Sequence, residues 1–176
     1  VHDRGHGLHS PLGLPVPGWL RDGHRLEHQL HGLLKSRLPK LAAHFDRLGV
    51  HPSMYSAQWF LTIFTYNFPF GVVVRIWDSF LAEGWKVVFR VAFAVLKVSS
   101  KELLNRGFED VMTYFRHLPT LLEPESLMDA AFSISLSQRE LDDLEADYRV
   151  TKAKEDEERR AMQEAARAGR LAKTAR

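Results

Sequence analysis

Apolar residues recur at helical spacing along most of the chain. The first stripe repeats at intervals of four, three and one residues, as one face of a helix does. Its members are Leu26, Leu30, Leu33 and Leu34. A second helix is predicted to begin at Pro39, because proline favours the first helical turn, and to end at Gly49, because glycine commonly stops helices. Its inward-facing residues are predicted to be Leu41, Phe45 and Leu48.

The middle of the chain is more apolar, and its period again indicates helices. From Pro52 one face carries Tyr55, Trp59 and Ile63, with Phe60 and Phe64 beside it. The segment from Pro69 to Gly84 contains a run of β-branched residues, which is typical of strands, yet its apolar positions repeat at i, i+4 and i+8. These positions are Val72, Val73, Ile76, Trp77, Phe80 and Leu81. Because the period outweighs local propensity, we predict a helix.

The next segment, residues 85–98, is about fourteen residues long, which exceeds an ordinary strand and suits a helix. The predicted core therefore includes the large side chains of Trp59, Phe60, Trp77 and Phe89.

Shorter helices follow in the C-terminal part. One is predicted to be capped by Ser100, a second to follow Gly107, and a third to span residues 125–135. Ser137 and Glu140 have the spacing of a capping box, in which each side chain accepts a hydrogen bond from the other residue's amide, so a last helix should start there.

The pattern divides the chain into three parts. Residues 1–18 are rich in proline and glycine without an apolar period, which predicts a flexible lead. Residues 19–136 form one all-α domain. Residues 137–176 form a charged helical tail, because the apolar stripe soon ends and almost every residue from Thr151 onward is charged or alanine. The stripe consists of Leu141, Leu144 and Tyr148.

Composition narrows the function classes. The hydrophobic share of 45% over 176 residues can supply one core, and a net charge of +2 is too small to indicate nucleic-acid binding. The absence of cysteine excludes disulfides and thiolate metal sites and suits the cytoplasm. No apolar run reaches the roughly 20 residues of a transmembrane helix. Since the chain opens on Val1 with no secretory signal pattern, we expect a fragment of a longer protein.

Motifs for catalysis or cofactor binding are missing. The sequence has no phosphate-binding loop, nucleophile elbow or dinucleotide turn, so no cofactor is predicted. His24, His28 and His31 fall roughly on one side of a helix, but zinc needs three or four convergent ligands and no HExxH pattern is present, which favours a surface histidine cluster.

Charged residues inside the apolar segments favour a structural role. Arg75 and Asp78, and the flanking Glu83 and Arg90, are predicted to form ion pairs that fix helix packing.

Spaced motifs give the chain a family resemblance. They are Leu38-Pro39, Trp59-Phe60, Pro69, Arg75-Ile-Trp-Asp78, Glu83-Gly84 and Phe89-Arg90. In this spacing, residues 19–136 resemble the C-terminal half of the TBC domain of Rab GTPase-activating proteins. The resemblance implies a V-shaped helical fold and a Rab-type GTPase as partner. It also implies a role in vesicle trafficking, in the cytoplasm or at endomembranes through that partner.

The family's catalytic residues lie in the N-terminal half, as an arginine in IxxDxxR and a glutamine in YxQ. Arg25 falls in a DxxR spacing but has Trp19 in place of isoleucine, and Gln58 is one residue too far from Tyr55. We therefore interpret the chain as part of a Rab GTPase activator that lacks both catalytic residues and is inactive alone. The alternative is a TBC-like binding or scaffold protein without activating function. A helical interaction domain unrelated to GTPases is a third, less favoured interpretation.

A partner-facing patch is predicted beside the Trp59 helix. Polar groups on such an apolar helix should face water or a partner, although they equally fit plain surface or local caps. The residues are Gln58, Thr62, Thr65 and Asn67.

Overall fold

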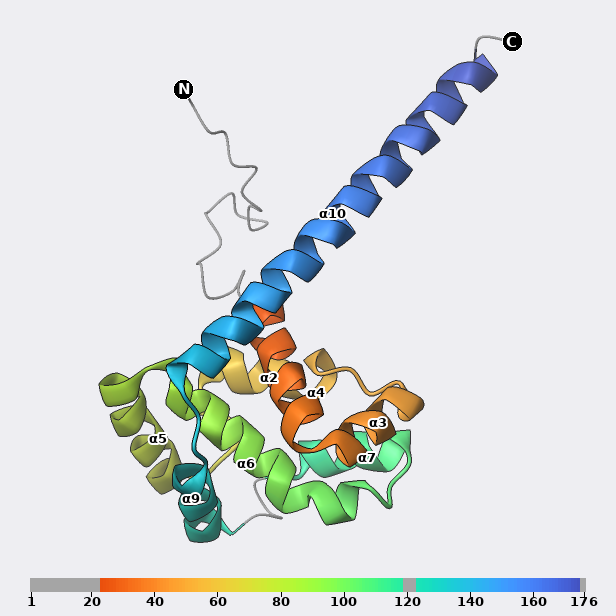
Figure 1. Ribbon diagram of the computed structural model, residues 1–176. Helices are drawn as coiled ribbons and strands as arrows, with labels where there is room; N and C mark the ends of the chain where they lie inside the picture. Colours follow the sequence, from red (N-terminus) through yellow and green to blue (C-terminus); the bar gives the residue numbers. More distant parts are fainter. Residues whose placement is uncertain (1–22, 119–122, 175–176) are drawn as a thin grey trace.

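The structure is a computed structural model that describes residues 23–118 and 123–174, with side chains up to residue 166. Within these residues it is all helical, as predicted, and Figure 1 shows a helical body from which one long helix projects. The helices are α2 (Gly23–Arg37), α3 (Pro39–Leu48), α4 (Ser53–Thr62), α5 (Phe70–Glu83), α6 (Trp85–Leu103), α7 (Phe108–Arg116), α9 (Pro124–Ser133) and α10 (Gln138–Thr174). The predicted flexible lead, residues 1–18, lies outside the described part.

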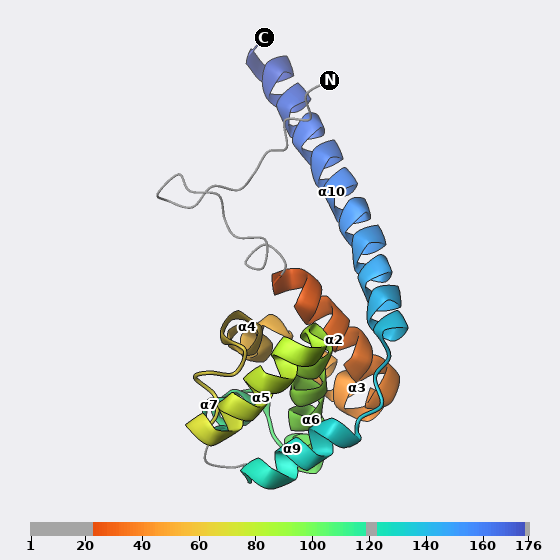
Figure 2. The ribbon, with the colours of Figure 1, turned by 90° about the vertical axis from the view of Figure 1, so that its left-hand side faces the viewer.

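Helix α6 forms the centre of the body. It contacts α2, α4, α5 and α9, which lie around it (Figures 1 and 2). Eleven of its residues are buried, from Val87 to Leu103, and they lie on nearly every side of the helix. The predicted stripe of α2 is fully buried against this core, and Gly49 ends α3 in the left-handed conformation, as the sequence indicated.

Two helix ends differ from the prediction. Ser100 does not cap a separate helix, because Leu96, Ser99 and Leu103 continue one buried face of α6 through that point. Helix α4 ends at Thr62, because the next two residues adopt positive φ angles, 46° at Ile63 and 62° at Phe64. Such angles are unfavourable for a β-branched residue such as Ile63. They place Phe64 in the core, where it is completely buried and its ring centroid lies 5.7 Å from that of Trp59.

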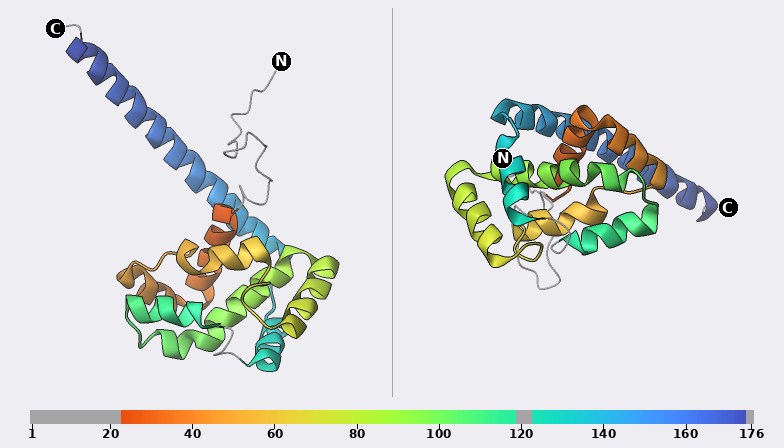
Figure 3. Two further views of the ribbon diagram at one scale, coloured as in Figure 1. Left: turned by 180° about the vertical axis from the view of Figure 1, so that it is seen from behind. Right: turned by 90° about the horizontal axis from the view of Figure 1, so that it is seen from below.

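The predicted core position of Trp77 is wrong. Trp59, Phe60 and Phe89 are buried, whereas Trp77 remains 38% exposed. Helix α5 lies at the edge of the body (Figure 3) and rests on α6 through other residues, so the core covers only part of its apolar surface. The residues that it buries are Val72, Val73 and Ile76.

One of the two predicted ion pairs forms. Glu83 and Arg90 join α5 to α6 with an oxygen to nitrogen distance of 2.9 Å. Arg75 instead lies 3.6 Å from Glu125 on α9, because its side of α5 faces that helix, and Asp78 is exposed. Arg75 therefore links α5 to α9, whereas the predicted pair with Asp78 would have lain within α5.

Helix α10 begins as the capping motif predicted, but only half of the box forms. The Ser137 hydroxyl accepts a hydrogen bond from the Glu140 amide at 3.1 Å, whereas the Glu140 carboxylate binds Arg37 of α2 at 2.6 Å. The first turns of α10 lie against α2, where Gly32 allows Leu144 to approach the α2 backbone closely. The rest of α10 extends away from the body (Figures 1 and 2). Among the described helices, none is both long and apolar enough to cross a membrane.

Candidate partner-binding surfaces

The predicted polar patch lies at the end of α4 and in the turn that follows. Gln58 and Thr65 are exposed, and Thr62 is half-buried. Both threonine hydroxyls donate to nearby carbonyl oxygens, Thr62 to Gln58 at 2.8 Å and Thr65 to Thr62 at 2.7 Å. These bonds fit the local caps that the sequence also allowed. The oxygens remain able to accept a hydrogen bond from a partner.

Asn67 is placed differently from the other three residues. It is only 7% exposed, so it does not face water as expected. Its Oδ1 atom is buried and has no hydrogen-bond partner among the described residues. The chain turns inward at this point because the neighbouring Phe64 and Phe68 are buried together, with ring centroids 5.5 Å apart. The surface part of the patch is therefore Gln58, Thr62 and Thr65.

An apolar groove of about 420 Å³ lies beside this patch, between the end of α4 and α5. Its lining residues are Phe60, Leu61, Thr62, Ile63, Trp77, Phe80 and Trp85. Phe80 packs between the two tryptophans of the groove. Its ring centroid lies 6.0 Å from that of Trp77 and 5.6 Å from that of Trp85, both in edge-on contacts. Sequence reasoning missed this groove, although the many apolar positions of α5 were a signal for a second apolar face.

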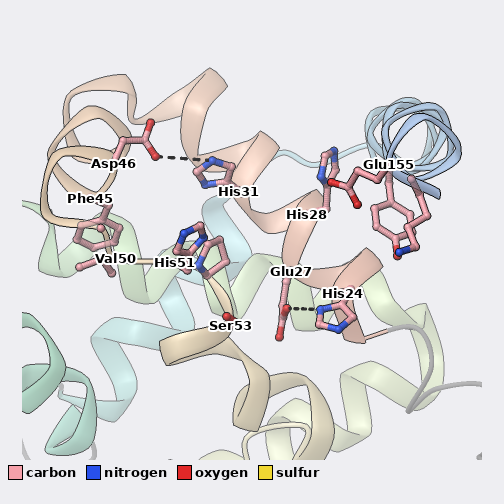
Figure 4. A pocket seen from close by; sticks show the side chains of 14 residues that line it. His24, Glu27, His28, His31, Phe45, Asp46, Val50, His51, Ser53 and Glu155 are labelled. Atoms are coloured by element: carbon pink, nitrogen blue, oxygen red, sulfur yellow. Dashed lines mark hydrogen bonds and ion pairs between the residues drawn. The ribbon is translucent and has the colours of Figure 1, made fainter. Parts of the chain in front are cut away.

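The predicted histidine cluster lines a separate pocket of about 610 Å³ between α2, the junction of α3 and α4, and α10 (Figure 4). Figure 4 shows His31 directed toward Asp46 of α3 and His24 directed toward Glu27 of its own helix. His24 lies 3.3 Å from Glu27, His28 lies 2.8 Å from Asp147 and His31 lies 4.0 Å from Asp46. Among the described residues, no group of three or more such side chains is arranged to hold a metal ion.

Electrostatics in this pocket follow from partial burial. Burial raises the pKa of Glu27 above its ordinary value, although the neighbouring His24 acts in the opposite direction. Burial also lowers the pKa of His31, and the nearby Lys35 adds to that effect. The pocket thus disfavours charge on both groups, and the His28 contact with Asp147 joins α2 to α10. This arrangement fits a role in helix packing better than a role in catalysis.

Arg25, the near-match to a catalytic arginine considered above, also joins α2 to α10. Its guanidinium donates to the Glu145 carboxylate at 2.6 Å, and each side chain is less than a quarter exposed. Burial raises the pKa of Glu145, but hydrogen bonds from Arg149 and Arg25 outweigh burial and leave the pKa below its ordinary value. Glu145 is therefore charged at neutral pH and holds Arg25 against α10.

Comparison with known proteins identifies the domain. Residues 20–104 match the Rab-GTPase-TBC domain. This part of the chain belongs to the TBC domain family. The match covers the segment in which the spaced motifs lie, and α2 to α6 make up its structure.

Curated relatives agree with the family. The chain is 35% identical over 134 residues to the human ecotropic viral integration site 5 protein homolog, a match that covers 74% of this chain and 16% of that protein. It is 35% identical over 133 residues to the Rab GTPase-activating protein eat-17 of Caenorhabditis elegans, covering 74% of this chain and 15% of that protein. The chain thus spans about a sixth of the length of these relatives.

Solved structures confirm the fold. The Chlamydomonas flagellar RabGAP TBC domain has a TM-score of 0.56 at 33% identity, covering 60% of this chain and 37% of that one. The Ypt/Rab-GAP domain of Gyp1p has a TM-score of 0.53 at 25% identity, covering 66% of this chain and 37% of that one. Only part of each solved domain is therefore represented by this TBC segment.

Proposed function

We propose that this TBC segment is part of a Rab GTPase-activating protein and contributes a surface that holds a Rab-type GTPase. The observation that carries the proposal is the family match at residues 20–104. The relative eat-17, which is a Rab GTPase-activating protein, supports it. Binding to a membrane-attached GTPase would bring the protein from the cytoplasm to endomembranes.

Activation requires groups that this segment does not offer in suitable positions. GTP hydrolysis is accelerated by a cation that stabilises charge on the transferring phosphoryl group, and an arginine supplied in trans raises the rate by about 10³–10⁵. Arg25 is bound to Glu145, and Tyr55 of the YxQ-like spacing is buried in the core. Arg25 thus has a structural role, whereas Gln58 is exposed and lies one residue out of the YxQ spacing. The proposal is that catalytic residues come from another part of the domain.

The GTPase-facing residues proposed are Gln58, Thr62 and Thr65. Gln58 and Thr62 belong to the last turns of α4, Thr65 lies in the turn that follows, and Thr62 also lines the apolar groove. Polar groups around an apolar depression are a common arrangement for a protein interface. Asn67, which is buried, would support the turn instead of contacting the partner.

Single-turnover hydrolysis by a panel of GTP-loaded Rab proteins, with and without excess chain, tests the missing catalytic residues. We expect no acceleration by the chain alone. An acceleration that Arg25→Ala abolishes would show that Arg25 is catalytic after all and would overturn this part of the proposal. A parent transcript that encodes IxxDxxR and YxQ upstream would favour the activator over the non-activating binding protein.

Binding to the same panel tests the surface. Thr65→Arg should weaken binding of the preferred Rab by about tenfold or more, as loss of an interface contact worth about 1.4 kcal/mol does. Ser133→Arg on α9 is the matched control, since Ser133 is also exposed and also donates its hydroxyl to a carbonyl three residues earlier, that of Ala130. Equal effects of the two substitutions would contradict the assignment of the surface.

A further inference from the structure

Helix α5 has more apolar surface than the body of the molecule covers. Successive residues of an α-helix are rotated by about 100°, so the apolar side chains of α5 span an arc of roughly 200°. One half of the arc, centred on Val72, Val73 and Ile76, is buried. The other half carries Phe70, Val74, Trp77 and Leu81 at spacings of four, three and four, and we name these four residues the outer stripe.

The outer stripe is exposed along its whole length. Phe70 is 82% exposed and Leu81 is 77% exposed, while Val74 and Trp77 retain more than a third of their surface. The apolar groove of about 420 Å³ opens beside it, with Trp77 shared between the two. A continuous apolar face of this kind marks a site of contact with another apolar surface.

The outer stripe is distinct from the polar face of α5. A third face of the helix carries Arg75 and Asp78, and Arg75 already contacts Glu125 of α9. The helix therefore has a face for the core, a polar face and an apolar face that the described residues cover only in part. An ordinary amphipathic surface helix has only a core-facing apolar side and a polar side. The exposed apolar face of α5 is therefore an additional feature.

A second copy of the chain is a poor occupant on grounds of area. The stripe runs over eleven residue steps, about 17 Å, on a helix about 10 Å wide. Its footprint is thus on the order of 200 Å², and even the accessible surface of its four side chains, on the order of 400 Å², is well below the roughly 800 Å² per partner that a stable dimer buries. A segment of the same polypeptide needs less contact area, because a covalent connection raises its effective concentration.

The solved TBC domains extend beyond the part that this chain matches. This chain matches only 37% of each of the two solved domains, so each contains elements without a counterpart in the matched part. We infer that the outer stripe and the adjoining groove form the seat of the remainder of the TBC domain, which would place an apolar helix face there. The inference rests on the proposed function insofar as both require the parent protein to contain a larger TBC domain.

Thiol labelling tests the inference, since the chain has no cysteine of its own. The probe is the unmatched portion of the Chlamydomonas RabGAP TBC domain, made free of cysteine and joined to this chain. Leu81→Cys reports on the stripe, and Val98→Cys is the control because Val98 is 48% exposed on α6. In the chain alone both thiols should react quickly. In the joined protein Leu81→Cys should react at least about tenfold more slowly, with Val98→Cys nearly unchanged.

A second measurement guards against misfolding of the joined protein. Phe70→Asp combined with Leu81→Asp should leave the melting midpoint of the chain alone nearly unchanged and lower that of the joined protein by roughly 4 °C or more, whereas Val98→Asp should affect both proteins alike. Equal labelling of Leu81→Cys in both proteins, or a joined protein without a cooperative transition, would overturn the inference.

Two further outcomes separate the alternatives. Slower labelling of Leu81→Cys with rising concentration of the chain alone, together with a doubled mass by light scattering, would assign the stripe to a second copy and overturn the inference. Neither measurement uses a GTPase. A protected stripe without Rab binding would therefore refute the proposed function alone, and Rab binding with an unprotected stripe would refute this inference alone.

Discussion

Helices α5 and α6 follow each other directly and are both rich in apolar, β-branched residues, yet the fold uses them differently. Helix α6 buries eleven residues around most of its circumference, whereas α5 buries three and exposes a complete apolar stripe. The two helices have similar local sequences but different surroundings. Helix α6 lies in the middle of the body, whereas α5 lies at its edge (Figure 3). Apolar content alone therefore does not tell how much of a helix is buried.

The largest effect expected separates the two helices directly. Phe89→Ala in α6 should lower the free energy of unfolding by about 3–5 kcal/mol, since it removes a fully buried ring and leaves a cavity. Trp77→Ala in α5 should cost about 1–2 kcal/mol, because the indole is 38% exposed and keeps an edge-on contact with Phe80. Urea unfolding measures both. Equal costs would mean that Trp77 is a core residue and that the contrast between the helices is false.

The junction of the two helices comes next. Gly84 has φ 70° and ψ −152°, a conformation that is essentially restricted to glycine, and no atom would obstruct an added Cβ. Gly84→Ala should therefore cost about 1–3 kcal/mol purely through backbone strain. Gly49→Ala, at φ 71° and ψ 25°, is the control and should cost about 1 kcal/mol, because that conformation is less restrictive. Thermal unfolding that ranks the two substitutions in the opposite order would contradict this account.

Polar groups buried beside α6 should have a measurable effect of intermediate size. The Tyr114 hydroxyl donates to Ser99 of α6 at 2.9 Å, so Tyr114→Phe should cost about 1–2 kcal/mol by leaving the serine oxygen unpaired. The Tyr55 hydroxyl is buried without a hydrogen-bond partner among the described residues, and burial raises its pKa. Tyr55→Phe should thus be neutral or stabilising by about 0.5 kcal/mol. A loss on Tyr55→Phe as large as on Tyr114→Phe would reveal a bond that this structure does not contain.

The smallest effect is expected at α10, a helix with even less cover than α5. Its contacts with α2 end near Tyr148, whose ring lies 5.4 Å from that of His28. Truncation after Tyr148 removes residues without an apolar face and should change the free energy of unfolding by less than about 1 kcal/mol. Calorimetry of the full and truncated chains measures it, and a larger loss would show that the charged tail contributes to the folded body.

Much of the fold could be predicted because it depends on local rules. The stripe of α2, the proline start and glycine end of α3, and the serine cap of α10 each follow from neighbouring residues, and the structure contains all of them. The placement of Trp77 could not be predicted in this way. The apolar positions of α5 form two adjoining faces, and the helical period allows either of them to face the core. The same holds for Asn67, whose burial depends on the turn formed by Ile63 and Phe64.

By itself, the sequence determined where helices occur, that they form one apolar core, and, through motifs such as Leu38-Pro39 and Trp59-Phe60, which family the segment resembles. These properties depend on spacing along the chain, and spacing is visible in one dimension. The tertiary structure alone decided which of two apolar faces of α5 is covered and that Arg75 contacts Glu125. It also decided that Arg25 is bound to Glu145, 120 residues further along the chain. Each of these depends on which distant helix packs against the segment, and the helical period of a segment does not specify its packing partner.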